Sequence, residues 1–179
     1  NREGSGDMYS KGANLLHTIR QLTKDDEVWR QTLRGLNKEF YHSTVTTGEI
    51  EKYISKSIGM DLSKVFDQYL RDYRVPVFEY EITNGILMYR WNDVIDGFNM
   101  PIEVIIDGKN TVLYPTSEFK KLPIKNLFIN VDDDYYVFKK DLKIIIDSWL
   151  KKPDITITNL LITMIFELYR VFFIFTITI

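Results

Sequence analysis

The hydrophobic period of the chain changes at Pro76, and this change constrains the fold more than any other feature of the sequence. Before Pro76, apolar residues recur every three or four positions, which is typical of helices that bury one face. After Pro76, apolar and polar residues alternate, which is typical of half-buried strands. The residue before a proline also disfavours helix. The sequence therefore predicts helices followed by strands, the α+β class.

Four helical segments are predicted before residue 75. Thr46 and Glu49 have the capping-box spacing at the start of the third segment. Asp25 and Asp26 lie near the start of the second, and Asp61 can cap the fourth. The expected buried faces are Gly12, Leu15, Leu16, Ile19 and Leu22; Trp29, Leu33, Leu36 and Phe40; Ile50, Tyr53, Ile54 and Ile58; and Leu62, Val65, Phe66, Tyr69 and Leu70.

Three strand pairs are expected after Pro76. In the first, residues 77–82 and 87–91 alternate around Asn84-Gly85, a favoured two-residue hairpin turn. The second joins residues 102–106 to 111–114, and a third hairpin joins 127–131 to 135–138. Short strands joined by tight turns favour an antiparallel β-sandwich over a parallel sheet with crossover helices. The sequence thus predicts a helical bundle followed by a sandwich.

Composition narrows the classes of partner. The formal net charge is -2 and no long run of Lys or Arg is present, so we expect no nucleic acid partner. The chain has no cysteine, which excludes disulfides and thiolate chemistry but fits a cytoplasmic protein and a periplasmic or secreted one equally. Residues 1–6 lack both an initiating Met and an apolar signal region, so we expect the sequence to begin within a longer protein.

The last stretch, residues 155–179, is almost entirely Ile, Leu, Phe and Thr. As one helix it would reach roughly 37 Å, enough to cross a bilayer core, although Glu167, Arg170 and many β-branched residues weaken that interpretation. A strand or a buried apolar segment fits as well. A third interpretation is that residues 142–179 are not the native end of the protein.

The sequence carries no complete catalytic motif. It has no HExxH helix for zinc and no GxSxG nucleophile elbow. His17 and His42 have no partner histidine at helical spacing, so we predict a structural role for each and assign no metal ligand. The acidic run 132–134 lacks the spacing of a calcium loop and is predicted to be a solvated turn.

Several segments resemble one family in the same order. Residues 7–12, Asp-Met-Tyr-Ser-Lys-Gly, followed by 15–20, resemble the tyrosine-bearing helix of zinc aminopeptidases of the aminopeptidase N and leukotriene A4 hydrolase type, the gluzincin metallopeptidases. The likeness continues through residues 29–42, 46–50, 61–70 and 75–80. It covers roughly residues 7–115, about 60% of the chain, and does not include the tail. The ordered succession is more specific than any single segment.

The resemblance implies a role for Tyr9. In this family the tyrosine of the Tyr-x-Lys-Gly segment donates a hydrogen bond to the oxygen that becomes negative when water attacks the peptide carbonyl. A phenol keeps its proton at neutral pH, and one well-placed donor is worth roughly 3 kcal/mol. On spacing alone Lys11 is a solvated charge, and Gly12 is expected to permit close helix packing.

The resemblance also implies what the chain lacks. The zinc ligands, the general base and the motif that holds the substrate's amino terminus are expected upstream of residue 1, so zinc and peptide substrate belong to the full-length protein and this chain alone should be inactive. Residues 1–74 would end a thermolysin-like catalytic domain, 75–141 would form a β-sandwich domain, and 142–179 a tail of unknown role. Leu15, Leu16 and Ile19 are then expected to be exposed, because they would pack on the missing zinc-binding helices. The alternative is a non-catalytic interaction module whose apolar tail binds a partner or a membrane.

Overall fold

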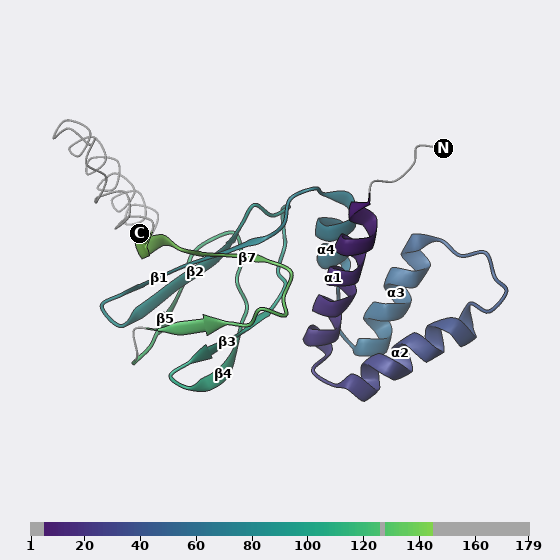
Figure 1. Cartoon of the computed structure of the whole chain (residues 1–179), viewed down its shortest axis with the longest axis horizontal. Coiled ribbons are helices and arrows are strands. Elements are labelled where there is room, and N and C mark those ends of the chain that lie inside the picture. Colours follow the sequence, from purple (N-terminus) through teal and green to yellow (C-terminus); the bar gives the residue numbers. More distant parts are fainter. Residues whose placement is uncertain (1–5, 126–127, 145–179) are drawn as a thin grey trace. The chain divides into compact units, whose positions relative to one another are not determined.

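The computed structural model describes residues 6–125 and 128–144 (Figure 1). The chain divides into two units, residues 1–140 and 141–179, and almost every described element belongs to the first. Helices occupy residues 7–71 and strands residues 77–141, so the α+β class and the change at Pro76 are confirmed. None of the helices in the described ranges is long and apolar enough to cross a membrane. The predictions for residues 155–179 lie outside the described residues.

The helices begin and end close to their predicted signals. They are α1 Asp7–Thr23, α2 Asp26–Glu39, α3 Thr47–Ile58 and α4 Ser63–Phe66, which continues as the π-helical turn η1, Asp67–Arg71. The Asp25 carboxylate accepts the first free amides of α2, and Thr46 and Glu49 form the predicted capping box. The Asp61 carboxylate accepts the Ser63 amide at 2.9 Å, at the start of α4. These side chains satisfy helix-start amides that have no partner within the helix.

The fourth helical segment differs from its predicted face. Leu62, Val65, Phe66 and Tyr69 are buried as expected, but Leu70 is about half exposed and Gln68 is fully buried. The prediction assumed α-helical winding throughout. From Asp67 the backbone instead makes the wider i→i+5 turn of a π-helix, which rotates the following residues relative to the α-helical spacing.

The expected exposure of α1 is largely wrong. Leu15 and Ile19 are buried in a core shared with Trp29 of α2 and Tyr69 of η1, and only Leu16 of the three is substantially exposed. Side chains at positions i and i+4 share one face of a helix, whereas Leu16 lies one residue round from Leu15. The chain itself therefore covers the face of α1 that carries Leu15, Ile19 and Leu22. The exposed face carries Leu16.

In the described ranges, seven strands follow the helices and form two sheets, several of which are labelled in Figure 1. They are β1 Val77–Thr83, β2 Ile86–Asn92, β3 Ile102–Ile106, β4 Lys109–Leu113, β5 Lys120–Pro123, β6 Ile129–Val131 and β7 Phe138–Asp141. One sheet has the order β5-β2-β1-β7 and the other β4-β3-β6. The pairs β1–β2, β2–β5, β3–β4 and β3–β6 are antiparallel, as the tight turns predicted.

The first hairpin matches its prediction in register. Phe78 lies opposite Trp91 and Tyr80 opposite Tyr89, so the alternating aromatic residues of the two strands share one face. Asn84 and Gly85 both have positive φ, 51° and 75°, as the favoured type I′ turn requires. The second hairpin, β3–β4, also forms where it was predicted, with a turn at Asp107-Gly108.

The predicted third hairpin does not form. β6 pairs with β3 in one sheet, whereas β7 lies beside β1 in the other. The connection between β6 and β7 is too long for a tight turn, and within it Tyr135 is buried and the Tyr136 amide donates to Thr18 Oγ1 of α1 at 3.0 Å. The Phe138 amide then donates to the Pro76 carbonyl at 2.9 Å, beside the start of β1. The segment from β6 to β7 therefore runs from one sheet to the other.

A set of buried hydrogen bonds links η1 and α1 to the strand region. The Tyr69 hydroxyl donates to the Tyr136 carbonyl at 2.7 Å, and the Tyr136 amide donates to Thr18. Gln68 completes the link, because its Oε1 accepts the Ile95 amide at 2.7 Å while its Nε2 donates to the Arg74 carbonyl at 3.0 Å. Thr18, Gln68 and Tyr69 are all fully buried, so these bonds form where water cannot replace them.

Candidate functional site

Tyr9, the residue that the sequence analysis singled out, lies in the first turn of α1 and is 74% exposed. Ala13 and Leu16, four and seven residues later, are exposed as well, and this spacing places all three on one face of the helix. The opposite face carries the buried residues Leu15 and Ile19. The Tyr9 hydroxyl is therefore outside the chain's own core, on a face that the described residues leave open.

Gly12 lies on the same side of α1, and its expected close packing is absent. A Cβ atom built at Gly12 would meet nothing within 4 Å among the described residues. The close approach occurs elsewhere, because a Cβ at Gly35 of α2 would lie 2.1 Å from the Tyr53 hydroxyl of α3. The close approach at Gly35 was not predicted from the sequence, and packing of Gly12 against residues outside the described ranges stays a prediction.

Lys11 is not the solvated charge that its spacing suggested. Its Nζ donates a hydrogen bond of 2.7 Å to the main-chain carbonyl of Asp72, 61 residues further along the chain. Asp72 immediately follows η1, so this carbonyl lies at a helix end, where a cation is favourable. The bond joins the start of α1 to the end of η1.

The acceptor segment is itself held in place. The Asp72 carboxylate accepts hydrogen bonds from the Arg74 amide at 2.8 Å and from its guanidinium at 2.8 and 2.9 Å. These bonds, with the nearby charge of Lys11, lower the pKa of Asp72 to about 2. Asp72 therefore stays ionised throughout the physiological range and keeps the turn after η1 fixed.

Both histidines have local partners. His17 Nε2 lies 3.3 Å from Asp134 Oδ1 and also 3.3 Å from Gln21 Nε2. His42 has a positive φ of 53° and packs edge-on against the Tyr41 ring. The two residues lie in α1 and in the turn after α2.

A zinc site cannot be assembled from the described residues. In the described ranges no three His, Cys, Asp or Glu side chains come together in a way that could hold a metal ion. The ligand set of a catalytic zinc, usually three protein side chains, therefore does not fit this part of the chain. We derive no step through a metal for these residues.

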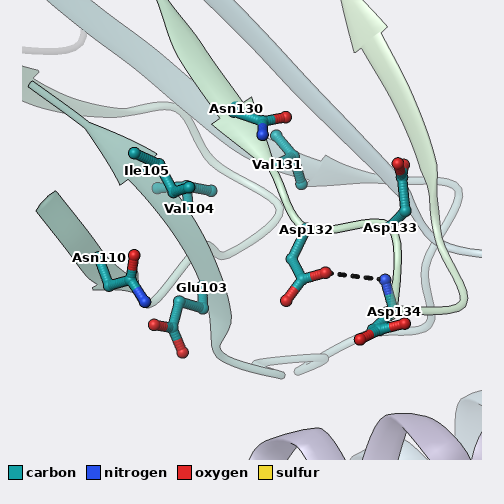
Figure 2. A pocket seen from close by; sticks show the side chains of 9 residues that line it. All are labelled: Glu103, Val104, Ile105, Asn110, Asn130, Val131, Asp132, Asp133 and Asp134. Atoms are coloured by element: carbon teal, nitrogen blue, oxygen red, sulfur yellow. Dashed lines mark hydrogen bonds between the residues drawn. The ribbon is translucent and has the colours of Figure 1, made fainter. Parts of the chain in front are cut away.

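The acidic run 132–134 forms an exposed turn beside a pocket of about 420 Å³ (Figure 2). The Asp132 carboxylate accepts the Asp134 amide at 3.0 Å, as in a solvated Asx turn. Figure 2 shows the Asp133 side chain directed away from Asp132 and Glu103. Asp133 pairs with Lys139, Asp134 with His17, and Glu103 with Lys24. Each of these three carboxylates therefore has a partner within the chain. The turn itself is exposed, as predicted.

Glu79 is a buried charge that sequence reasoning missed. It occupies an alternate position of β1 that was expected to face water, yet its side chain is almost fully buried and binds Arg90, Asn92 and Lys140. Burial opposes its charged form, but the hydrogen bonds from Lys140 and Arg90 outweigh burial and lower the pKa of Glu79. Oppositely charged residues at paired positions, such as Glu79 and Arg90, are the one signal that predicts such a cluster.

The fold resembles that of a solved aminopeptidase. Aminopeptidase A of Legionella pneumophila, in complex with aspartic acid, superposes with a TM-score of 0.56 over 73% of this chain, at 17% sequence identity. The matched region is 17% of the Legionella chain, so this chain spans a small part of that protein. No protein-family model and no curated protein matches the sequence. At this identity the likeness shows a shared fold.

Proposed function

We propose that this chain is the C-terminal part of a zinc metallo-aminopeptidase of the aminopeptidase N type, which removes residues from the amino termini of peptides. The fold likeness to part of an aminopeptidase supports the proposal, as does the ordered resemblance of residues 7–115 to that family. The single observation that carries it is the exposure of Tyr9. A tyrosine sealed in the core of this chain would have no access to a substrate.

In this proposal Tyr9 stabilises the transition state. When water attacks the scissile carbonyl, the carbonyl oxygen becomes negative, and the phenol donates a hydrogen bond to it. Such a donor accelerates the reaction because it is already oriented before the charge forms. The phenol does not lose its proton in this role, so no base is required beside it.

The remaining parts of the chain act as scaffold. Residues 1–74 would end the thermolysin-like catalytic domain, and the two sheets of residues 75–141 would form the β-sandwich domain. The zinc ligands, the general base and the residues that bind the substrate's amino group would lie upstream. The described residues supply none of these groups together, so we expect the chain by itself to be inactive.

The test is steady-state hydrolysis by the chain joined to its natural upstream region. Leucine, alanine and aspartate anilides are suitable substrates, the last because the Legionella protein was solved with aspartic acid. We expect Tyr9→Phe to lower kcat by roughly 10²- to 10³-fold, since it removes one oxyanion donor. KM should change little, because this bond strengthens only in the transition state.

Tyr41→Phe is the matched control, because Tyr41 is as exposed as Tyr9 but lies in the turn after α2. It should leave kcat unchanged. A loss of only a few-fold in Tyr9→Phe would argue against the oxyanion role. An upstream coding sequence without an HExxH motif would favour the alternative, a non-catalytic interaction module.

A further inference from the structure

We propose that Lys11 is the positioning residue for Tyr9: its hydrogen bond to the Asp72 carbonyl holds the first turn of α1 in place. This inference rests on the proposed function, and it adds a residue for which the sequence pattern alone indicated only a solvated charge. Three observations lead to it: α1 has no side-chain cap at Gly6, the side chains described in its first turn are exposed, and Lys11 bonds to a distant main-chain atom.

The start of α1 lacks the usual reinforcement. Its N-cap is Gly6, which has no side chain to accept a free amide, whereas α2 and α3 begin with side-chain caps. A helix start without a cap leaves amides without partners and frays readily. Tyr9 lies within this uncapped turn.

The side chains described in this turn do not pack in the core. The first buried residue among the described side chains of α1 is Leu15, six residues after Tyr9. Among the described side chains of the first two turns, Tyr9, Ser10, Ala13 and Asn14 are exposed, and Gly12 has open space around it. In these turns the Lys11 side chain makes a long-range hydrogen bond, to the Asp72 carbonyl.

The geometry of Lys11 suits an anchor. Positions i and i+2 of a helix point to different sides, so Lys11 reaches inward to Asp72 while Tyr9 remains on the outer face. Its acceptor is a main-chain atom in a turn that Asp72 and Arg74 hold with three hydrogen bonds. Lys11 therefore acts on Tyr9 through the helix backbone and need not touch the substrate.

The first test is a double-mutant cycle in the full-length protein. Lys11→Met should lower kcat roughly tenfold with little change in KM, because a small displacement of an aligned group is costly in rate. Lys11→Arg keeps a cationic donor and should recover most of the loss. In a Tyr9→Phe background, Lys11→Met should have no further effect. Lys38→Met, at an exposed lysine in the last turn of α2, is the control and should match the parent.

The outcomes separate the two proposals. A normal kcat in Tyr9→Phe contradicts the proposed function. A severe loss in Tyr9→Phe with a normal kcat in Lys11→Met overturns only the positioning role. An equal loss from Lys11→Met in both backgrounds also overturns it, because the effect would then not pass through Tyr9.

The second test uses the 179-residue chain and needs no activity. Amide hydrogen exchange in Lys11→Met should be at least tenfold faster at residues 11–14, in the turn that follows the start of α1 at Asp7, and unchanged at residues 18–22. Unchanged exchange at residues 11–14 would overturn the anchoring role. This readout decides the inference even if the full-length protein proves to have no peptidase activity.

Discussion

Two tyrosines in neighbouring helical regions have opposite surroundings. Tyr69 of η1 is 1% exposed, burial raises its pKa, and its hydroxyl is committed to the Tyr136 carbonyl. Tyr9 of α1 is 74% exposed, and its turn has no side-chain cap. The comparison shows that the exposed hydroxyl belongs to a turn whose described side chains lie outside the core, whereas the buried hydroxyl joins η1 to the strand region.

The largest expected effect on the free energy of unfolding comes from a substitution on the buried face of α1, compared with one on its exposed face. Ile19→Ala should lower the free energy of unfolding by about 2–5 kcal/mol, because it removes buried methyl groups and leaves a cavity. Leu16→Ala, on the open face, should change it by less than about 0.5 kcal/mol. Chemical denaturation of the 179-residue chain measures both. Equal losses would mean that the two faces are not distinct.

The second-largest loss of stability is expected from breaking the ion pairs of the buried Glu79 on β1. Glu79→Ala leaves Arg90 and Lys140 without their shared carboxylate and should cost about 2–4 kcal/mol, since buried charge pairs are costly to break. Because the pKa of Glu79 is lowered in the folded state, its contribution is present above the unfolded pKa and is lost as the pH falls through the folded one. Urea midpoints from pH 7 down to pH 3 should show this loss in the parent and a flatter profile in Glu79→Ala.

The two hydroxyls can be compared directly. Tyr69→Phe leaves the Tyr136 carbonyl without its donor in a buried site and should cost about 1–3 kcal/mol. Tyr9→Phe in the same chain should cost less than about 0.5 kcal/mol. Thermal unfolding followed by circular dichroism is sufficient. A large loss of stability in Tyr9→Phe would give this residue a structural role and weaken the proposed chemical one.

Two glycines provide a further comparison. Gly35→Ala places a methyl group where the Tyr53 hydroxyl lies, so the Tyr53 side chain must move away from α2, at a cost of about 1 kcal/mol. Gly12→Ala meets open space in a helix interior and should stabilise the isolated chain by roughly 0.5–1 kcal/mol. In the full-length protein the gain at Gly12 should vanish if the proposed upstream region packs there. Denaturation midpoints of both variants in both proteins test this.

The smallest effect concerns the turn that receives Lys11. The Arg74 hydrogen bonds lower the pKa of Asp72 to about 2, below its ordinary value of 3.8. The contribution of Asp72 to stability is therefore present above the unfolded pKa and is lost as the pH falls from about 5 towards 2. The difference in unfolding temperature between the parent and Asp72→Asn should narrow over this interval. A difference that is constant with pH would mean that the ion pair does not contribute.

Local patterns predicted much of the fold. The caps at Asp25 and Thr46 and the turn at Asn84-Gly85 depend on residues close in sequence, so their types were sufficient to predict them. The position of β7 depends on pairing with β1, about sixty residues earlier, and no local pattern encodes that choice. The π-helical turn that exposes Leu70 is equally invisible to a period count.

The candidate site was predictable only in part. Tyr9 was found through a family resemblance, not through its own spacing. Lys11 and Asp72 meet through a side chain and a main-chain atom 61 residues apart, and a main-chain acceptor has no residue type to recognise. Leu15 and Leu16 are adjacent leucines, and which of them faces the core depends on where the neighbouring helices pack.

The central claim is that the outer face of α1 is open in this chain and covered by the rest of the protein, with Tyr9 facing the active site. Hydroxyl-radical footprinting of the 179-residue chain and of the full-length protein tests it most directly. The account predicts strong labelling of Tyr9 and Leu16 in the isolated chain and a marked fall in the full-length protein, while Tyr41 stays labelled in both. Equal labelling of Tyr9 in the two proteins would contradict it.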